Sequence, residues 1–184
     1  MELTKKEKDS LLDIVKKTIA AKVNNADLKN IAADSPTLRE KRGAFVTLKK
    51  RGNLRGCIGY INAVKPLWET VQEMALAAAF HDPRFPSLKP EELKELTFEI
   101  SVLSPLQRVK DISEIQLGKH GLYIVHGHNS GLLLPQVASE YGWDRETFLK
   151  ETCGKAGLQP HAWQDKETEI YIFSADYFGD TDNI

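Results

Sequence analysis

The 184-residue chain contains only two cysteines, Cys57 and Cys153. Two thiols are too few for a disulfide framework, so we expect both to be reduced. No apolar run approaches the roughly 20 residues needed to span a bilayer. The first twenty residues are rich in Lys and Glu, so we expect no signal peptide and a cytoplasmic protein.

An excess of positive charge is also missing. The chain has 25 Lys and Arg against 26 Asp and Glu, which gives a net charge of −1. Proteins that bind nucleic acid usually carry a basic excess that neutralises phosphates, so this balance argues against such a partner. The apolar fraction of 41% and the charged fraction of 28% are ordinary for a folded protein. The length fits one globular domain over residues 1–184.

The common catalytic and metal-binding motifs are absent from the sequence. There is no Gly-rich phosphate loop, no Cys-x-x-Cys pair, no His-Glu-x-x-His and no Gly-x-Ser-x-Gly. His126 and His128 could place two imidazoles on one side of a strand, but the neighbouring glycines predict an exposed turn without a third ligand. We therefore expect no metal site and no cofactor.

The apolar spacing predicts a mixture of helices and hairpins. A capping box at residues 4–7 opens a helix that ends near Val23, and a polar connecting segment follows over 24–41. The further expected elements are strands 43–50 and 54–61, a helix from Pro66, a helical turn 91–96, a strand 97–103, a hairpin of 121–125 with 131–134, a helix from Asp144 to about Gly154, and a last strand 169–174. This order predicts an α+β fold with a mainly antiparallel sheet flanked by helices.

The most informative stretch is the hexapeptide Leu54–Gly59 on the second strand. Strict alternation places Arg55, Cys57 and Gly59 on one face of that strand. A guanidinium beside a thiol stabilises the thiolate, which a reactive cysteine requires. Gly56 and Gly59 could let a ligand or another backbone approach closely. The alternative is that Cys57 is a small core residue and that Arg55 reaches solvent or pairs with a carboxylate.

The loop over residues 81–86 carries three ionisable side chains and two prolines. His81, Asp82 and Arg84 could present a base, an acid and an anion clamp from one rigid span. In the structural alternative, Asp82 caps its own turn, Arg84 pairs with a buried carboxylate and Phe85 fills the core.

Glu99 lies on the polar side of its strand, opposite apolar neighbours. If that face lines a cleft, Glu99 is a candidate general base or a partner for Arg55 or Arg84; otherwise it faces solvent. We expect Arg55, Cys57, Asp82, Arg84 and Glu99 to converge around one cleft. Cys57, Glu99 and His81 are the catalytic candidates, and the ligand-binding candidates are Arg55, Gly56, Gly59, Asp82 and Arg84.

The hexapeptide resembles the hallmark motif of the AMMECR domain family. Similar stretches are residues 43–48, 82–85, 99–105, 131–137 and 153–158, so the resemblance covers most of the chain. It implies an α+β fold with a larger and a smaller lobe, and a candidate pocket near the hexapeptide. Prokaryotic members are labelled component A of the AmmeMemoRadiSam system, which implies a Memo-type protein and a radical S-adenosylmethionine enzyme as partners. It implies no settled activity.

Two functions remain open at this point. In one, Cys57 is the nucleophile of an enzyme, Arg55 stabilises its thiolate, and Glu99, or His81 with Asp82, transfers protons. In the other, the chain is a non-catalytic binding component, and Arg55 and Arg84 hold a small anionic ligand or a carboxylate of a partner. The absence of a complete catalytic constellation favours the second.

Overall fold

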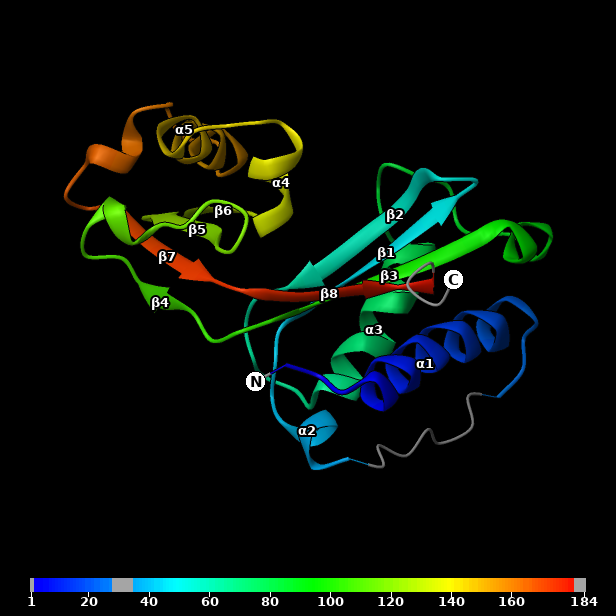
Figure 1. The fold of residues 1–184 in the computed structure, drawn as a ribbon. Coiled ribbons are helices and arrows are strands. Elements are labelled where there is room, and N and C mark those ends of the chain that lie inside the picture. The colour runs from blue at the N-terminus through cyan, green and yellow to red at the C-terminus, as the bar shows by residue number, and fades with distance from the viewer. Residues whose placement is uncertain (1, 28–34, 181–184) are drawn as a thin grey trace. The chain divides into compact units, whose positions relative to one another are not determined.

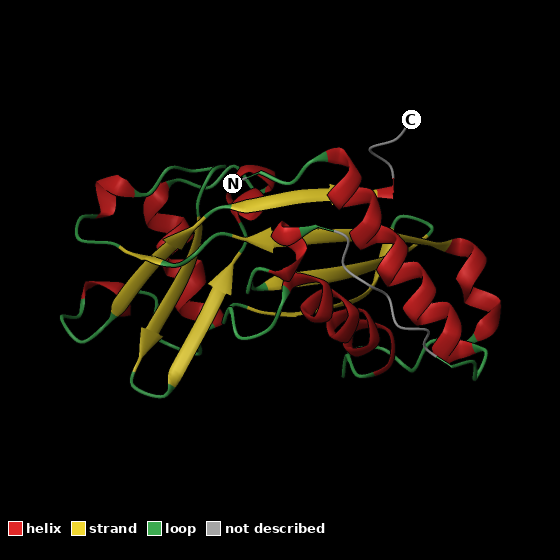
Figure 2. Cartoon of the chain, turned by 90° about the horizontal axis from the view of Figure 1, so that it is seen from below, coloured by secondary structure: helices red, strands yellow, loops and turns green. Residues whose placement is uncertain are grey.

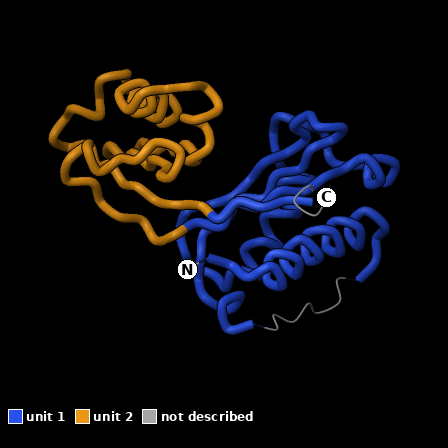
Figure 3. The backbone as a smooth tube through the Cα atoms, viewed as in Figure 1, with its two compact units in different colours: residues 1–103, 176–184 blue, residues 104–175 orange. Residues whose placement is uncertain are grey.

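The chain divides into two compact units. The computed structural model describes residues 2–27 and 35–180. Unit 1 contains residues 1–103 and 176–184, and unit 2 contains residues 104–175 (Figure 3). Within the described ranges, no helix is both long and apolar enough to cross a bilayer.

Unit 1 contains a four-stranded sheet in the order β2-β1-β3-β8, so β2 is one of its edge strands. Its elements are α1 (Lys5–Val23), α2 (Pro36–Arg39), β1 (Ala44–Lys50), β2 (Asn53–Tyr60), α3 (Leu67–Phe80), the 3₁₀ helix η1 (Pro90–Glu95), β3 (Leu96–Leu103) and β8 (Ala175–Gly179) (Figure 1).

One face of this sheet packs against helices. The side chains of Ala44, Val46 and Leu48 alternate along β1, and all three are fully buried in a cluster that includes residues of α1 and α3. Figures 1 and 2 show both helices on the same side of the sheet. The expected capping box is present: Thr4 and Glu7 bond each other's backbone N–H groups at the start of α1. A strand period of two and a capped helix therefore build the core as the sequence indicates.

Unit 2 contains a second four-stranded sheet, in the order β4-β7-β5-β6. The Asp144 side chain accepts a hydrogen bond from the Thr147 N–H at 2.7 Å and caps α5, whose residues Phe148 and Leu149 are fully buried. The elements are β4 (Gln107–Arg108), η2 (Ile112–Glu114), β5 (Gly121–His126), β6 (Asn129–Leu133), α4 (Pro135–Glu140), α5 (Arg145–Lys155), η3 (Ala162–Gln164) and β7 (Glu169–Phe173).

The predicted α+β fold, mainly antiparallel and flanked by helices, is confirmed, but its strands form two four-stranded sheets and not one. Residues 169–174 are not the last strand, however, because β8 follows β7 after one residue and joins the other sheet. The chain stays extended as it passes from one sheet to the other, so its sequence contains no turn signal that separates the two strands. The segment 24–41, expected as a connection, contains α2, and its residues 28–34 lie outside the described residues.

Candidate functional site

The hexapeptide strand contains a β-bulge at Arg55. The register pairs Thr47 of β1 with Cys57 and Lys49 with Leu54, and the extra residue Arg55 has no residue opposite it. A bulge shifts the alternation of side chains by one residue. Strict alternation was therefore the wrong prediction here: Leu54, not Arg55, shares a face of the sheet with Cys57.

Arg55 pairs with a carboxylate from η1. Its Nε atom donates a hydrogen bond of 3.0 Å to Glu92 Oε1, and its Nη2 atom donates one of 3.0 Å to Glu92 Oε2. Nη2 also donates to the Pro86 carbonyl at 2.9 Å. The hydrogen bond from Arg55 lowers the pKa of Glu92 to about 2. Nη1 is buried without a hydrogen-bond partner in the described part of the chain, and the guanidinium carbon lies 5.9 Å from the Phe85 ring centre. The guanidinium thus lies against Glu92 rather than beside the thiol.

The two glycines of the hexapeptide face the protein's own atoms. A Cβ on Gly56 would lie 2.1 Å from the Ala78 carbonyl oxygen of α3, and a Cβ on Gly59 would lie 2.4 Å from the Phe45 ring. Both distances are far below van der Waals contact. Gly56 therefore lets α3 approach the sheet, and Gly59 lets an aromatic ring cover the strand.

Asp82 and Arg84 satisfy the free edge of β2 at Cys57. The Cys57 N–H donates to Asp82 Oδ2 at 2.9 Å, and Arg84 Nη2 donates to the Cys57 carbonyl at 3.2 Å. Arg84 also binds both oxygens of Asp82, with Nε at 3.0 Å and Nη2 at 2.7 Å. The hydrogen bond from Arg84 holds the pKa of Asp82, which is 3% exposed, well below its usual range. The loop replaces a neighbouring strand at this point.

Cys57 belongs to the face of the first sheet opposite α1 and α3, which we call the outer face. Its thiol is half-buried and accepts a hydrogen bond of 3.2 Å from the Thr47 hydroxyl. Thr47 is paired on its other side with Glu99, whose carboxylate binds Lys49 Nζ at 2.5 Å. The side chains on the outer face include Phe45, Thr47, Lys49, Leu54, Cys57 and Glu99.

The predicted site residues fall into two groups. Asp82 and Arg84 meet the Cys57 backbone, and Arg55 joins them through Phe85, whose ring centre is within 6 Å of both guanidinium carbons. Glu99 is separate from that group, because it lies on the outer face with Thr47 between it and Cys57. His81 is exposed at the end of α3. Three residues of this region were not predicted from the sequence: Glu92, Lys49 and Thr47. The strand pattern could have indicated the last two, whereas no sequence signal links Glu92 to Arg55.

His126 and His128, on either side of Gly127 in the predicted turn, lie in different environments. His126 Nδ1 lies 2.9 Å from the Thr168 hydroxyl, while His128 is exposed. Among the described residues, no three His, Cys, Asp or Glu side chains gather in a way that could hold a metal ion. The absence of a metal site stays a prediction.

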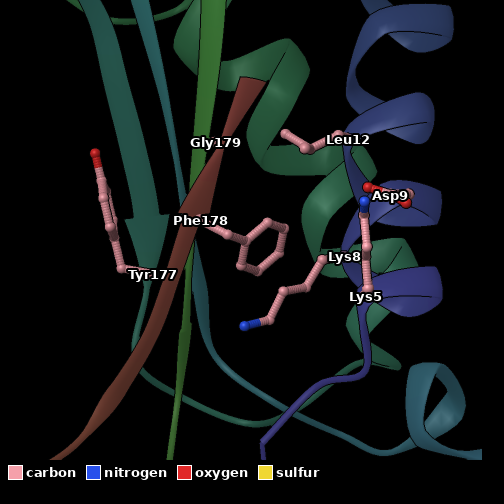
Figure 4. A pocket seen from close by; sticks show the side chains of 7 residues that line it. All are labelled: Lys5, Lys8, Asp9, Leu12, Tyr177, Phe178 and Gly179. Carbon is pink, nitrogen blue, oxygen red and sulfur yellow. The ribbon is translucent and has the colours of Figure 1, made fainter. Parts of the chain in front are cut away.

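A groove of about 310 Å³ lies elsewhere in unit 1, between the start of α1 and β8 (Figure 4). Phe178 points from β8 toward α1, and Tyr177 points to the opposite side. Lys8 on its wall already binds Asp176 at 2.7 Å and lies over the Phe178 ring. The ion pair between Lys8 and Asp176 therefore joins α1 to β8 beside the groove. None of the hexapeptide residues lines the groove.

The protein is an α+β protein with two antiparallel sheets, and its bulged hexapeptide strand lies at the edge of the first sheet. The chain belongs to the AMMECR1 family, whose model matches residues 12–178. A protein of Methanothermobacter thermautotrophicus is 45% identical over 183 residues, which cover 96% of this chain and 95% of that protein. One of Nanoarchaeum equitans is 41% identical, with 92% and 98% covered. The crystal structure of the uncharacterized protein PH0010 from Pyrococcus horikoshii is similar with a TM-score of 0.91, 37% identity, and coverage of 97% and 94%.

Proposed function

We propose that this protein is a binding component of a larger system, and that its partner docks on the outer face around Cys57. The observation that carries the proposal is that the carboxylates and guanidinium groups predicted to do acid–base or anion-binding work are already paired. The pairs are Arg55 with Glu92, Arg84 with Asp82, and Lys49 with Glu99.

These pairs work against catalysis and in favour of a rigid surface. A general base must reach the proton that it removes, directly or through one water. Glu99 would first have to leave Lys49, and Asp82 would have to leave the edge of β2. The same contacts fix the backbone of the hexapeptide, and a preorganised surface binds without a large cost of ordering.

The outer face offers an apolar contact beside a thiol. The Leu54 side chain is 44% exposed next to the half-buried Cys57, and Lys49 and Glu99 add polar groups on the same face. An apolar centre with a polar surround is typical of surfaces that bind other proteins.

The resemblance to component A of the AmmeMemoRadiSam system supplies the partner for this proposal. We propose that the Memo-type protein, or the radical S-adenosylmethionine enzyme, contacts the outer face. A small anionic ligand is the other form of the proposal. Arg84 would be its cation, because the pair with Asp82 uses only Nε and Nη2 and 52% of the side chain is exposed.

The test is to purify the three proteins from one organism and to measure complex formation by size exclusion and calorimetry. Leu54→Lys places a charge on the outer face and should weaken the complex about tenfold or more. Val64→Lys is the matched control, because Val64 is 57% exposed in the loop after β2, and it should leave the affinity unchanged. Failure of both proteins to bind, or equal effects of the two substitutions, would refute docking on this face.

A second function, an enzyme that uses Cys57 as nucleophile, is favoured by one contact. The Thr47 hydroxyl donates to Cys57 Sγ at 3.2 Å, and a donated hydrogen bond stabilises a thiolate. If that function holds, Thr47→Val should slow the reaction of Cys57 with iodoacetamide several-fold. An unchanged rate would remove the support for it.

A further inference from the structure

The sheet of unit 2 carries a row of four side chains, one from each strand. The register pairs Leu132 with Tyr123, Tyr123 with Tyr171, and Tyr171 with Arg108. The residues that alternate with this row, such as Ile124, are buried in the cluster that includes residues of α4 and α5. Because successive side chains point to opposite faces, the row lies on the face away from these helices.

Two tyrosines form the centre of this row. Tyr123 and Tyr171 come from β5 and β7, the two central strands of the sheet, and their ring centres are 6.1 Å apart. Both side chains are half-buried, so part of each stays accessible. A four-stranded sheet with aromatic side chains on its central strands is the surface on which RNA-recognition domains stack bases. Stacking on an aromatic ring requires only the flat face of the base.

A carboxylate and a guanidinium lie beside the tyrosines. Glu169 accepts a hydrogen bond from the Tyr171 hydroxyl and lies 3.7 Å from Arg108 Nη2. The Glu169 and Arg108 side chains are 40% and 61% exposed, and an ion pair of this length at the surface is weak, so it can open. A carboxylate accepts two parallel N–H donors, which guanine presents on one edge through its ring N–H and its amino group. Arg108 can donate to a ring nitrogen or carbonyl.

We infer that the exposed face of the unit 2 sheet binds one guanine-type base, as the free base or a nucleoside. The ring stacks on Tyr123 and Tyr171, and Glu169 accepts its two N–H donors. A nucleic acid strand is the disfavoured form of this ligand, because the chain has a net charge of −1 and no basic excess to neutralise successive phosphates. This site is independent of the outer face of the first sheet.

The experiment is saturation-transfer NMR and calorimetry on the full chain, with guanosine as the probe and adenosine as the comparison. Guanosine should receive saturation and should bind more tightly than adenosine, which lacks the two-donor edge. Tyr123→Leu and Tyr171→Leu should each weaken guanosine binding about tenfold or more. Glu169→Gln should abolish the preference over adenosine. Tyr141→Leu is the matched control, since Tyr141 is a 68% exposed tyrosine at the end of α4, and it should bind as wild type.

Three outcomes would overturn the inference. Guanosine could receive no saturation, both leucine variants could bind guanosine as the wild type does, or a guanine-containing oligonucleotide could bind about a hundredfold more tightly than guanosine. If the leucine variants fail to fold, the tyrosine ring resonances of wild-type protein decide. Guanosine should shift those of Tyr123 and Tyr171, and their invariance at saturating guanosine would refute the site.

Discussion

Replacing Asp82 by Asn should destabilise the protein by about 3 kcal/mol. The buried carboxylate accepts four hydrogen bonds: one from the Cys57 N–H, one from the Arg84 N–H, and two from the Arg84 guanidinium. Asn retains a single acceptor oxygen and turns an NH₂ group toward donors. Breaking a buried ion pair costs roughly 3–5 kcal/mol. The lower end applies because 52% of the Arg84 side chain is exposed and can regain water.

The loss should be measured by urea unfolding at pH 7. Because the units could unfold separately, Trp143 and Trp163 of unit 2 are replaced by Phe, so that fluorescence reports on Trp68 in α3. A loss of about 3 kcal/mol should lower the midpoint by roughly 1–2 M urea. Asp13→Asn is the control, since Asp13 is an exposed carboxylate of α1 in unit 1 that pairs with Lys17 at the surface, and it should cost about 1 kcal/mol or less. A stability of Asp82→Asn within about 0.5 kcal/mol of wild type would refute the edge-capping role.

Three further predictions test the packing and the ion pairs around the hexapeptide. The folded-state pKa of Glu92 is about 2, below its ordinary 4.5, so its ionisation stabilises the fold above pH 4.5, by about 3 kcal/mol. This stabilisation is lost as the pH falls toward 2. In Glu92→Gln the free energy of unfolding should therefore change less between pH 4.5 and 2 than in the wild type. An unchanged pH dependence over that interval would contradict the pairing. Gly56→Ala should prevent folding or cost about 3 kcal/mol or more. Gly154→Ala, in open space on α5, should stabilise the protein by about 0.5–1 kcal/mol. Calorimetric melting measures both effects, and equal effects of the two substitutions would refute the close approach of α3 to Gly56. Cys153 is fully buried, and burial raises the pKa of its thiol, so its labelling should follow unfolding; fast labelling of the folded protein would contradict this burial.

Local signals were enough to predict much of the fold. The capping box at Thr4, the cap at Asp144 and the alternation of β1 each act within a few residues, and the structure confirms the elements that they indicate. The site depended on contacts between distant residues. One additional residue in β2 turned Arg55 away from Cys57, and its partner Glu92 lies 37 positions away. Neither a bulge nor a distant ion pair leaves a periodic trace in one sequence.

The central claim is that the charged side chains around the hexapeptide hold β2 in place and do not activate Cys57. The most direct test is the rate at which iodoacetamide alkylates Cys57, followed by peptide mass spectrometry in the wild type and in folded Arg55→Lys and Glu99→Gln variants. Cys57 is half-buried and Cys153 is enclosed, so Cys57 should react faster than Cys153. The two variants should stay within about twofold of the wild-type rate. A slowing of about tenfold or more in either folded variant would contradict the claim and favour the enzyme.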